Sequence, residues 1–123
     1  MIIDKVRDVS EVRELFETRP MQTDVYDFDF IINNPHLYCF YDELNGELRG
    51  VIFITESENK LFLSGISVEK NFLNNVDAVV KVCESYKQDM YSDTDLKHAV
   101  IVLKKAGFKK YKNNIYIRRY KNG

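Results

Sequence analysis

Two hydrophobic periods alternate along this chain, and together they predict a mixture of helices and strands. Apolar residues at helical spacing predict helices over residues 10–18, 24–33, 75–87 and 95–106. Alternating or continuous apolar runs predict strands over residues 1–7, 37–41, 48–55, 61–68, 90–91, 109–112 and 115–120. The predicted order is therefore strand, two helices, three strands, helix, short strand, helix and two strands.

The three central strands predict an antiparallel meander. Asn45-Gly46 and Ser57-Glu58-Asn59 supply turn residues between them. Val51-Ile52-Phe53-Ile54 is apolar without a break, which is typical of a strand that is covered on both faces. The pattern therefore favours an α/β fold with helices on both faces of a mixed, mostly antiparallel sheet.

Capping residues and breakers set the expected ends of the helices. Ser10 is expected to cap the first helix, and Asn34-Pro35 to close the second. A residue within Ser92–Asp95 is expected to cap the last helix, which Gly107 should end.

Length and charge narrow the classes of protein. A chain of 123 residues fits one domain, so we expect residues 1–123 to form a single domain. The formal net charge is −1, so the total charge does not favour nucleic-acid binding, although the last fifteen residues are rich in Lys and Arg.

Cys39 and Cys83 lie in apolar patterns, and neither has a second Cys or His at metal-ligand spacing. We expect buried free thiols, a reducing compartment and no metal site. The sequence shows neither a long apolar run nor a signal-peptide pattern, so we expect a soluble, cytoplasmic protein without a membrane partner.

The C-terminal quarter resembles the closing segment of the GCN5-related N-acetyltransferase (GNAT) superfamily. In that family a helix ends in Gly-Phe and two strands follow, as they do here around Gly107-Phe108 and Asn113-Asn114. The predicted order of elements also fits the family over nearly the whole chain. The resemblance implies a twisted, mostly antiparallel sheet with helices on both faces.

The resemblance also implies a glycine-rich loop after the strand at residues 61–68, whose amides hold the pyrophosphate of coenzyme A. Residues 68–77 contain no glycine. Two interpretations stay open: a turn whose Asn or Asp caps the next helix, or a divergent cofactor loop. In the second case the contacts implied by the resemblance are Ile66, Val68, Lys70, Asn74 and Asn75.

The family's general acid is missing as well. Counting back from Gly107, the tyrosine that reprotonates the thiolate in many members falls on Leu103, and an associated asparagine falls on Leu96. Leucine cannot transfer a proton. The remaining candidates are Glu69 as a base and Tyr91 as a substitute acid.

These observations favour a GNAT-fold protein that has lost ordinary acetyl-coenzyme A catalysis and serves as a binding or assembly module. We expect no cofactor, and a protein partner or self-association. The alternative is an active N-acyltransferase that uses acetyl-coenzyme A and a divergent loop to acetylate a primary amine. Richness in Lys, Asn, Ile and Tyr would suit a phage or mobile-element gene.

Overall fold

The computed structural model describes residues 1–19 and 26–121, and these form two compact units. Unit 1 comprises Met1–Ile54 and Gly65–Lys70, and unit 2 comprises Thr55–Ser64 and Asn71–Gly123. The strands follow the order β1-β2-β3-β4-β5-β7-β6 in a seven-stranded sheet, in which β3 and β4 each contribute residues to both units. That residues 1–123 form a single domain stays a prediction.

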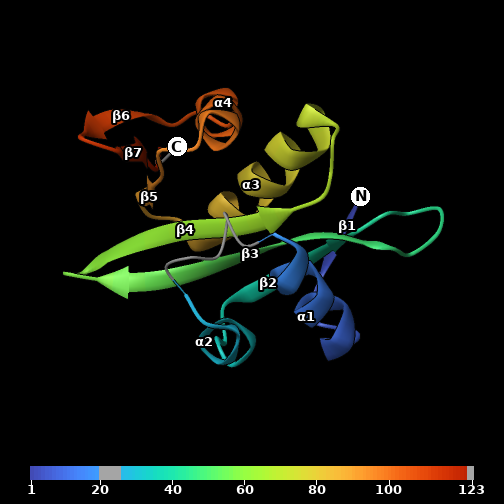
Figure 1. The fold of residues 1–123 in the computed structure, drawn as a ribbon. Helices are drawn as coiled ribbons and strands as arrows, with labels where there is room; N and C mark the ends of the chain where they lie inside the picture. Colours follow the sequence, from blue (N-terminus) through green and yellow to red (C-terminus); the bar gives the residue numbers. More distant parts are fainter. Residues whose placement is uncertain (20–25, 122–123) are drawn as a thin grey trace. The chain divides into compact units, whose positions relative to one another are not determined.

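The elements follow the predicted order, and Figure 1 traces them along the chain. The strands are β1 (Ile2–Asp4), β2 (Leu37–Tyr41), β3 (Leu48–Ser57), β4 (Lys60–Ser67), β5 (Met90–Asp93), β6 (Lys109–Lys112) and β7 (Ile115–Arg118). The helices are α1 (Val9–Thr18), α2 (Phe28–Ile32), α3 (Phe72–Tyr86) and α4 (Lys97–Lys105). The predicted α/β class is thereby confirmed.

Unit 1 is built on the antiparallel strands β1, β2 and β3. Ile3 lies opposite Phe40 in the first pair, and Cys39 lies opposite Val51 in the second. Side chains from α1 and α2 join the strands in one apolar cluster, whose buried members are Val12, Leu15, Phe28, Ile31, Leu37, Cys39, Tyr41, Val51, Phe53 and Ile66. The two N-terminal helices therefore cover one face of these strands.

Strand β3 is buried on both faces, as its continuous apolar run predicts. Val51 and Phe53 belong to the cluster that α1 and α2 cover, and they are 0% and 2% exposed. Ile52 and Ile54 alternate with them and are 3% and 2% exposed. Since successive side chains of a strand point to opposite faces, both faces of this stretch are shielded from water.

Two helix starts in unit 1 differ from the prediction. The N-cap of α1 is Asp8, whose carboxylate accepts the backbone N–H of Ser10, so Ser10 lies inside the helix. Helix α2 begins only at Phe28, where Asp27 accepts the N–H of Phe30. An aspartate side chain caps a helix as well as a serine does. Asp8 is therefore the N-cap of α1 in place of Ser10, and Asp27 is the N-cap of α2. Residues 24 and 25 lie outside the described residues.

Unit 2 combines one parallel and two antiparallel strand pairs. β4 and β5 are parallel at their beginnings, with Leu61 opposite Met90 and Phe62 opposite Tyr91. β7 pairs antiparallel with both β5 and β6, which makes β6 the last strand of the order. The predicted turn between β3 and β4 is present, with Glu58 and Asn59 both at positive φ.

The long helix α3 begins earlier than predicted, at Phe72, and ends at Tyr86, after which the C-cap Lys87 takes a left-handed conformation. Helix α4 begins at Lys97 without a side-chain cap, so the prediction of a cap within Ser92–Asp95 is wrong. Thr94 Oγ1 accepts the N–H of Leu96 instead, one residue before the helix.

The end of α4 shows why a glycine follows this helix. The N–H of Phe108 donates to Leu103 O, and the N–H of Gly107 donates to Lys104 O, which is the Schellman arrangement. Gly107 has a φ of +98°, a conformation that L side chains rarely adopt. Leu103 and Phe108, the pair of apolar positions that this motif favours, are both buried.

Both cysteines are buried free thiols, as predicted. Burial raises the pKa of Cys39 and of Cys83 to about 11, because the thiolate would lose its hydration. Among the described helices, none is long and apolar enough to cross a membrane.

Candidate functional site

The connection between β4 and α3, residues 68–71, occupies the place where the resemblance implies a cofactor loop. Its first residue is hydrogen bonded to β3 through the main chain. The N–H of Val68 donates to Arg49 O over 2.9 Å, and Arg49 Nη2 approaches Val68 O at 3.5 Å. The connection is therefore fixed to the neighbouring strand from its start.

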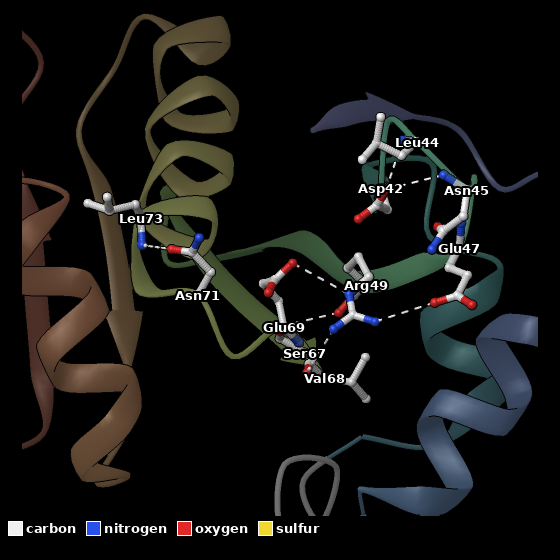
Figure 2. A network of polar contacts seen from close by, with 10 residues as sticks. All are labelled: Asp42, Leu44, Asn45, Glu47, Arg49, Ser67, Val68, Glu69, Asn71 and Leu73. Atoms are coloured by element: carbon white, nitrogen blue, oxygen red, sulfur yellow. Dashed lines mark hydrogen bonds and ion pairs between the residues drawn. The ribbon is translucent and has the colours of Figure 1, made fainter.

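Glu69 is held by an arginine. Figure 2 shows the guanidinium of Arg49 between Glu47 and Glu69, with Nε 3.4 Å from Glu69 Oε2 and Nη1 3.6 Å from Glu47 Oε2. The side chain of Glu69 is only 10% exposed, whereas that of Glu47 is 64% exposed. Of the two carboxylates that contact Arg49, that of Glu69 is therefore the more shielded from water.

The hydroxyl of Ser67 forms two hydrogen bonds within the same turn and to β3. Ser67 Oγ accepts the N–H of Glu69 over 2.9 Å and donates to Arg49 O over 3.3 Å. Both the main chain and the side chain of Glu69 are therefore positioned by neighbours in unit 1. The N–H and the carboxylate of Glu69 therefore both have partners within the protein.

Asn71 caps α3. Its side-chain oxygen accepts the N–H of Leu73 over 2.9 Å (Figure 2), and its backbone oxygen accepts the N–H of Asn75 over 3.2 Å. The expected Asn cap of this helix is therefore present, and whether the segment also holds a cofactor stays a prediction. Asn74 and Asn75 lie within the first turn of α3 at negative φ, and Asn75 is buried.

The other cofactor candidates differ in their surroundings. Ile66 is 2% exposed and belongs to the apolar cluster of unit 1, against which Val68 also packs. Lys70 is exposed. The side chains of Ile66 and Val68 therefore belong to the core.

Tyr91 lies on β5 opposite Phe62, near the beginning of β4, whereas Glu69 follows the end of that strand. Its ring packs between Phe62 and Tyr111, with centroids 5.6 Å away in both cases. Glu69 belongs to unit 1 and Tyr91 to unit 2, so each candidate is held by its own neighbours.

No family model and no curated protein sequence matches this chain. Solved structures do. GCN5 from Tetrahymena aligns with a TM-score of 0.66 at 12% identity, over 98% of this chain and 97% of its own. The chain has the GNAT fold.

Two other GNAT-fold structures cover the chain just as fully. Aminoglycoside 6'-acetyltransferase type Ii gives a TM-score of 0.67 at 16% identity, over 100% of this chain and 99% of its own. An aminoglycoside 6'-N-acetyltransferase complexed with coenzyme A gives 0.65 at 14% identity, over the same shares. At such identities the likeness shows the fold, and activity has to be argued from the residues.

The residues of the β4–α3 connection differ from the GNAT cofactor loop in two respects, the missing glycines and the bonded amides. The GNAT loop needs amide donors that are open to a phosphate and glycines that let the backbone approach it. Here the amides of Val68, Glu69 and Leu73 already donate to acceptors within the protein. Glu69 also brings a carboxylate, which is paired with Arg49, into the connection itself.

The position of the GNAT general acid has a packing role. Leu103 is 4% exposed, and its carbonyl accepts the N–H of Phe108 at the end of α4.

His98 is exposed and stacks on Phe72 of α3, with ring centroids 4.6 Å apart. In residues 1–19 and 26–121 we find no group of three or more His, Cys, Asp or Glu side chains that could hold a metal ion.

Sequence reasoning missed Arg49 and Ser67, the residues that fix Glu69. Ser67-x-Glu69 is a local signal, because a serine hydroxyl often accepts the N–H two residues later. Arg49 carried no such signal, because its contact with residues 67–69 depends on the pairing of two strands.

Proposed function

We propose that this GNAT-fold chain is a binding or assembly module that has lost ordinary acetyl-coenzyme A catalysis. The supporting observation is the closed β4–α3 connection, in which Arg49 holds Glu69 and Asn71 caps α3. The amides of Val68 and Glu69 in this connection are bonded within the protein, as the amides of a structural turn are. The apolar Leu103 at the position of the general acid points the same way.

The surface that we propose for a partner is β6 with the residues beside it. All four residues of β6 are exposed, and the strand lies at the end of the sheet order. From Leu96 onward the sequence carries nine Lys and Arg and no Asp or Glu. An edge strand with exposed lysines suits an acidic extended segment of a protein partner, which would add to the sheet through its main chain.

Binding of a fluorescent peptide of alternating Glu and Val tests this surface. We expect binding that weakens with salt and that is lost when Lys109, Lys110 and Lys112 are all changed to Glu. The matched control reverses three exposed lysines elsewhere, Lys5, Lys70 and Lys97, and should retain most of the affinity. An oligonucleotide of equal charge that binds more tightly than the peptide would overturn a protein partner in favour of nucleic acid.

One observation favours a second candidate. The chain aligns over its whole length with an acetyltransferase whose structure contains coenzyme A. An active N-acyltransferase would transfer acetyl to a primary amine, with Glu69 as the base, Tyr91 as the acid and acetyl-coenzyme A as cofactor. Phage or mobile-element origin stays a prediction from composition.

Release of free thiol from acetyl-coenzyme A separates the two candidates. With a polyamine or a lysine peptide as acceptor, the module proposal predicts no release above the uncatalysed background. Release that is lost in Glu69→Gln and retained in Glu47→Gln, a change in the exposed carboxylate beside the same arginine, would establish the enzyme.

A further inference from the structure

Unit 2 contains an open cavity of about 430 Å³, a volume in the range of small-molecule sites. Its lining comes from the turn between β3 and β4, the start of β4, the segment that follows α3, β5 and the segment after β7. Its polar residues include Asn59, Lys60, Lys87, Gln88, Tyr91 and Tyr120.

Tyr91 is a buried polar side chain whose hydroxyl has no partner in the described part of the chain. The residue is 8% exposed, and its ring contacts the rings of Phe62 and Tyr111 and the ammonium of Lys60. Since it lines the cavity, this is where the hydroxyl can find a partner. The hydroxyl stays open to water, so it can donate a hydrogen bond to a molecule bound in the cavity.

The charge of the lining is positive. Within residues 1–19 and 26–121 neither Lys60 nor Lys87 forms an ion pair, and the Lys60 ammonium lies 5.7 Å from the centre of the Tyr91 ring. Asp89 also lines the cavity, but its carboxylate accepts Arg119 Nη1 over 3.3 Å and the N–H of Tyr120 over 2.8 Å. The acid is therefore neutralised, and two ammonium groups are left without a counter-charge.

We propose that this cavity binds a small organic phosphate monoester of up to mononucleotide size. A phosphate monoester is close to a dianion at neutral pH, which matches the charges of Lys60 and Lys87. Its oxygens accept several hydrogen bonds, and the lining offers hydroxyl donors on Tyr91 and Tyr120 and carboxamide donors on Asn59 and Gln88. The volume exceeds that of a phosphate alone and leaves room for an organic group beside the tyrosine rings.

This site goes beyond the proposed function, and it is distinct from the β4–α3 connection. The cavity is lined by residues at the beginnings of β4 and β5, whereas the connection follows the end of β4. The proposal also gives Tyr91 the role of a binding residue in place of a catalytic acid.

Calorimetric titration at low salt with adenosine monophosphate, ribose 5-phosphate, inorganic phosphate and adenosine tests the proposal. We expect one site, with both phosphate esters binding more tightly than inorganic phosphate and with no binding of adenosine. Tyr91→Phe should lower the affinity by at least about tenfold, because it removes only the donor hydroxyl. The fold should tolerate this change, since that hydroxyl has no partner within residues 1–19 and 26–121.

The remaining variants are chosen to keep the fold. Lys87→Asn removes the charge and retains a residue that tolerates the φ of 53°, and Lys60→Met keeps an apolar stem near the Tyr91 ring. Each should weaken binding of the esters by at least about tenfold. Tyr116→Phe makes the same chemical change as Tyr91→Phe in a buried tyrosine of β7 outside the cavity lining and should leave the affinity unchanged.

Amide chemical shifts locate the site. Saturation with ribose 5-phosphate should move the signals of residues 59–61, 87–91 and 120 and leave those of residues 68–75 in place. Absence of saturable binding at millimolar ester, equal binding of adenosine, unchanged affinity in Tyr91→Phe, or shifts confined to residues 68–75 would each overturn the proposal. None of these outcomes changes the result of an acetyl-coenzyme A titration.

Discussion

Replacement of Arg49 by Met tests whether the β4–α3 connection is held by its arginine. The change removes the cation from Glu69, whose side chain is 10% exposed, and the donor 3.5 Å from Val68 O. Breaking a buried ion pair costs about 3 to 5 kcal/mol, whereas an exposed pair is worth about 0 to 1 kcal/mol. Arg49 is 25% exposed and lies 3.4 Å from Glu69, so we expect a loss of roughly 2 kcal/mol.

Urea unfolding of the variant and of two controls measures this value. Glu47→Gln removes the exposed partner of the same arginine and should cost less than about 0.5 kcal/mol. Glu69→Gln combined with Arg49→Met should cost less than the sum of the single changes, by about 1 kcal/mol of coupling. A cost below about 0.5 kcal/mol for Arg49→Met, or additive effects, would show that the pair does not stabilise the connection.

Three further predictions concern the core and the ends of elements. Phe53→Ala should cost ~3 to 5 kcal/mol in urea unfolding, because Phe53 is 2% exposed and its ring meets Tyr26 edge to face; a cost below about 1 kcal/mol would contradict its burial. Gly107→Ala should lower the free energy of unfolding by about 1 to 2 kcal/mol, because alanine is strained at a φ of +98°. The added Cβ would lie 3.5 Å from Arg118 Nε, so no clash contributes. An unchanged urea midpoint would rule out strain at this position. Because burial raises the pKa of both thiols from 9.0 to about 11, Cys39 and Cys83 should react with Ellman's reagent only after unfolding. The stability that the two neutral thiols contribute should be complete below pH 9 and fall as the pH rises toward 11, and a urea midpoint that rises over this range would be the wrong sign.

The sequence predicted those parts of the fold that depend on local patterns. The strand Leu37–Tyr41 has the predicted bounds, because its apolar run is closed by turn residues on both sides. The order of elements is also as predicted. Helix starts were less predictable. Asp8 can cap a helix as well as Ser10, and Asp27 as well as Asp24, and capping propensity alone does not tell which residue of each pair will be the cap.

The candidate site was predictable only in part. The missing glycines and the leucine at position 103 could be read from the sequence once the family resemblance was noticed. That α3 begins three residues earlier, with Asn71 as its cap, follows from a local competition among three asparagines. The Arg49–Glu69 pair and the cavity near Tyr91 depend on which strands and turns meet, and periodicity carries no information on that.

Calorimetric titration of the unmodified protein with acetyl-coenzyme A tests the central claim most directly. The claim is that residues 68–71 form a structural turn, in which the amides of Val68 and Glu69, like that of Leu73 in the first turn of α3, are already bonded. The account predicts no saturable binding of acetyl-coenzyme A at millimolar concentration that shifts the amide signals of residues 66–75. Micromolar binding with shifts in those signals would contradict it and would establish a working cofactor loop.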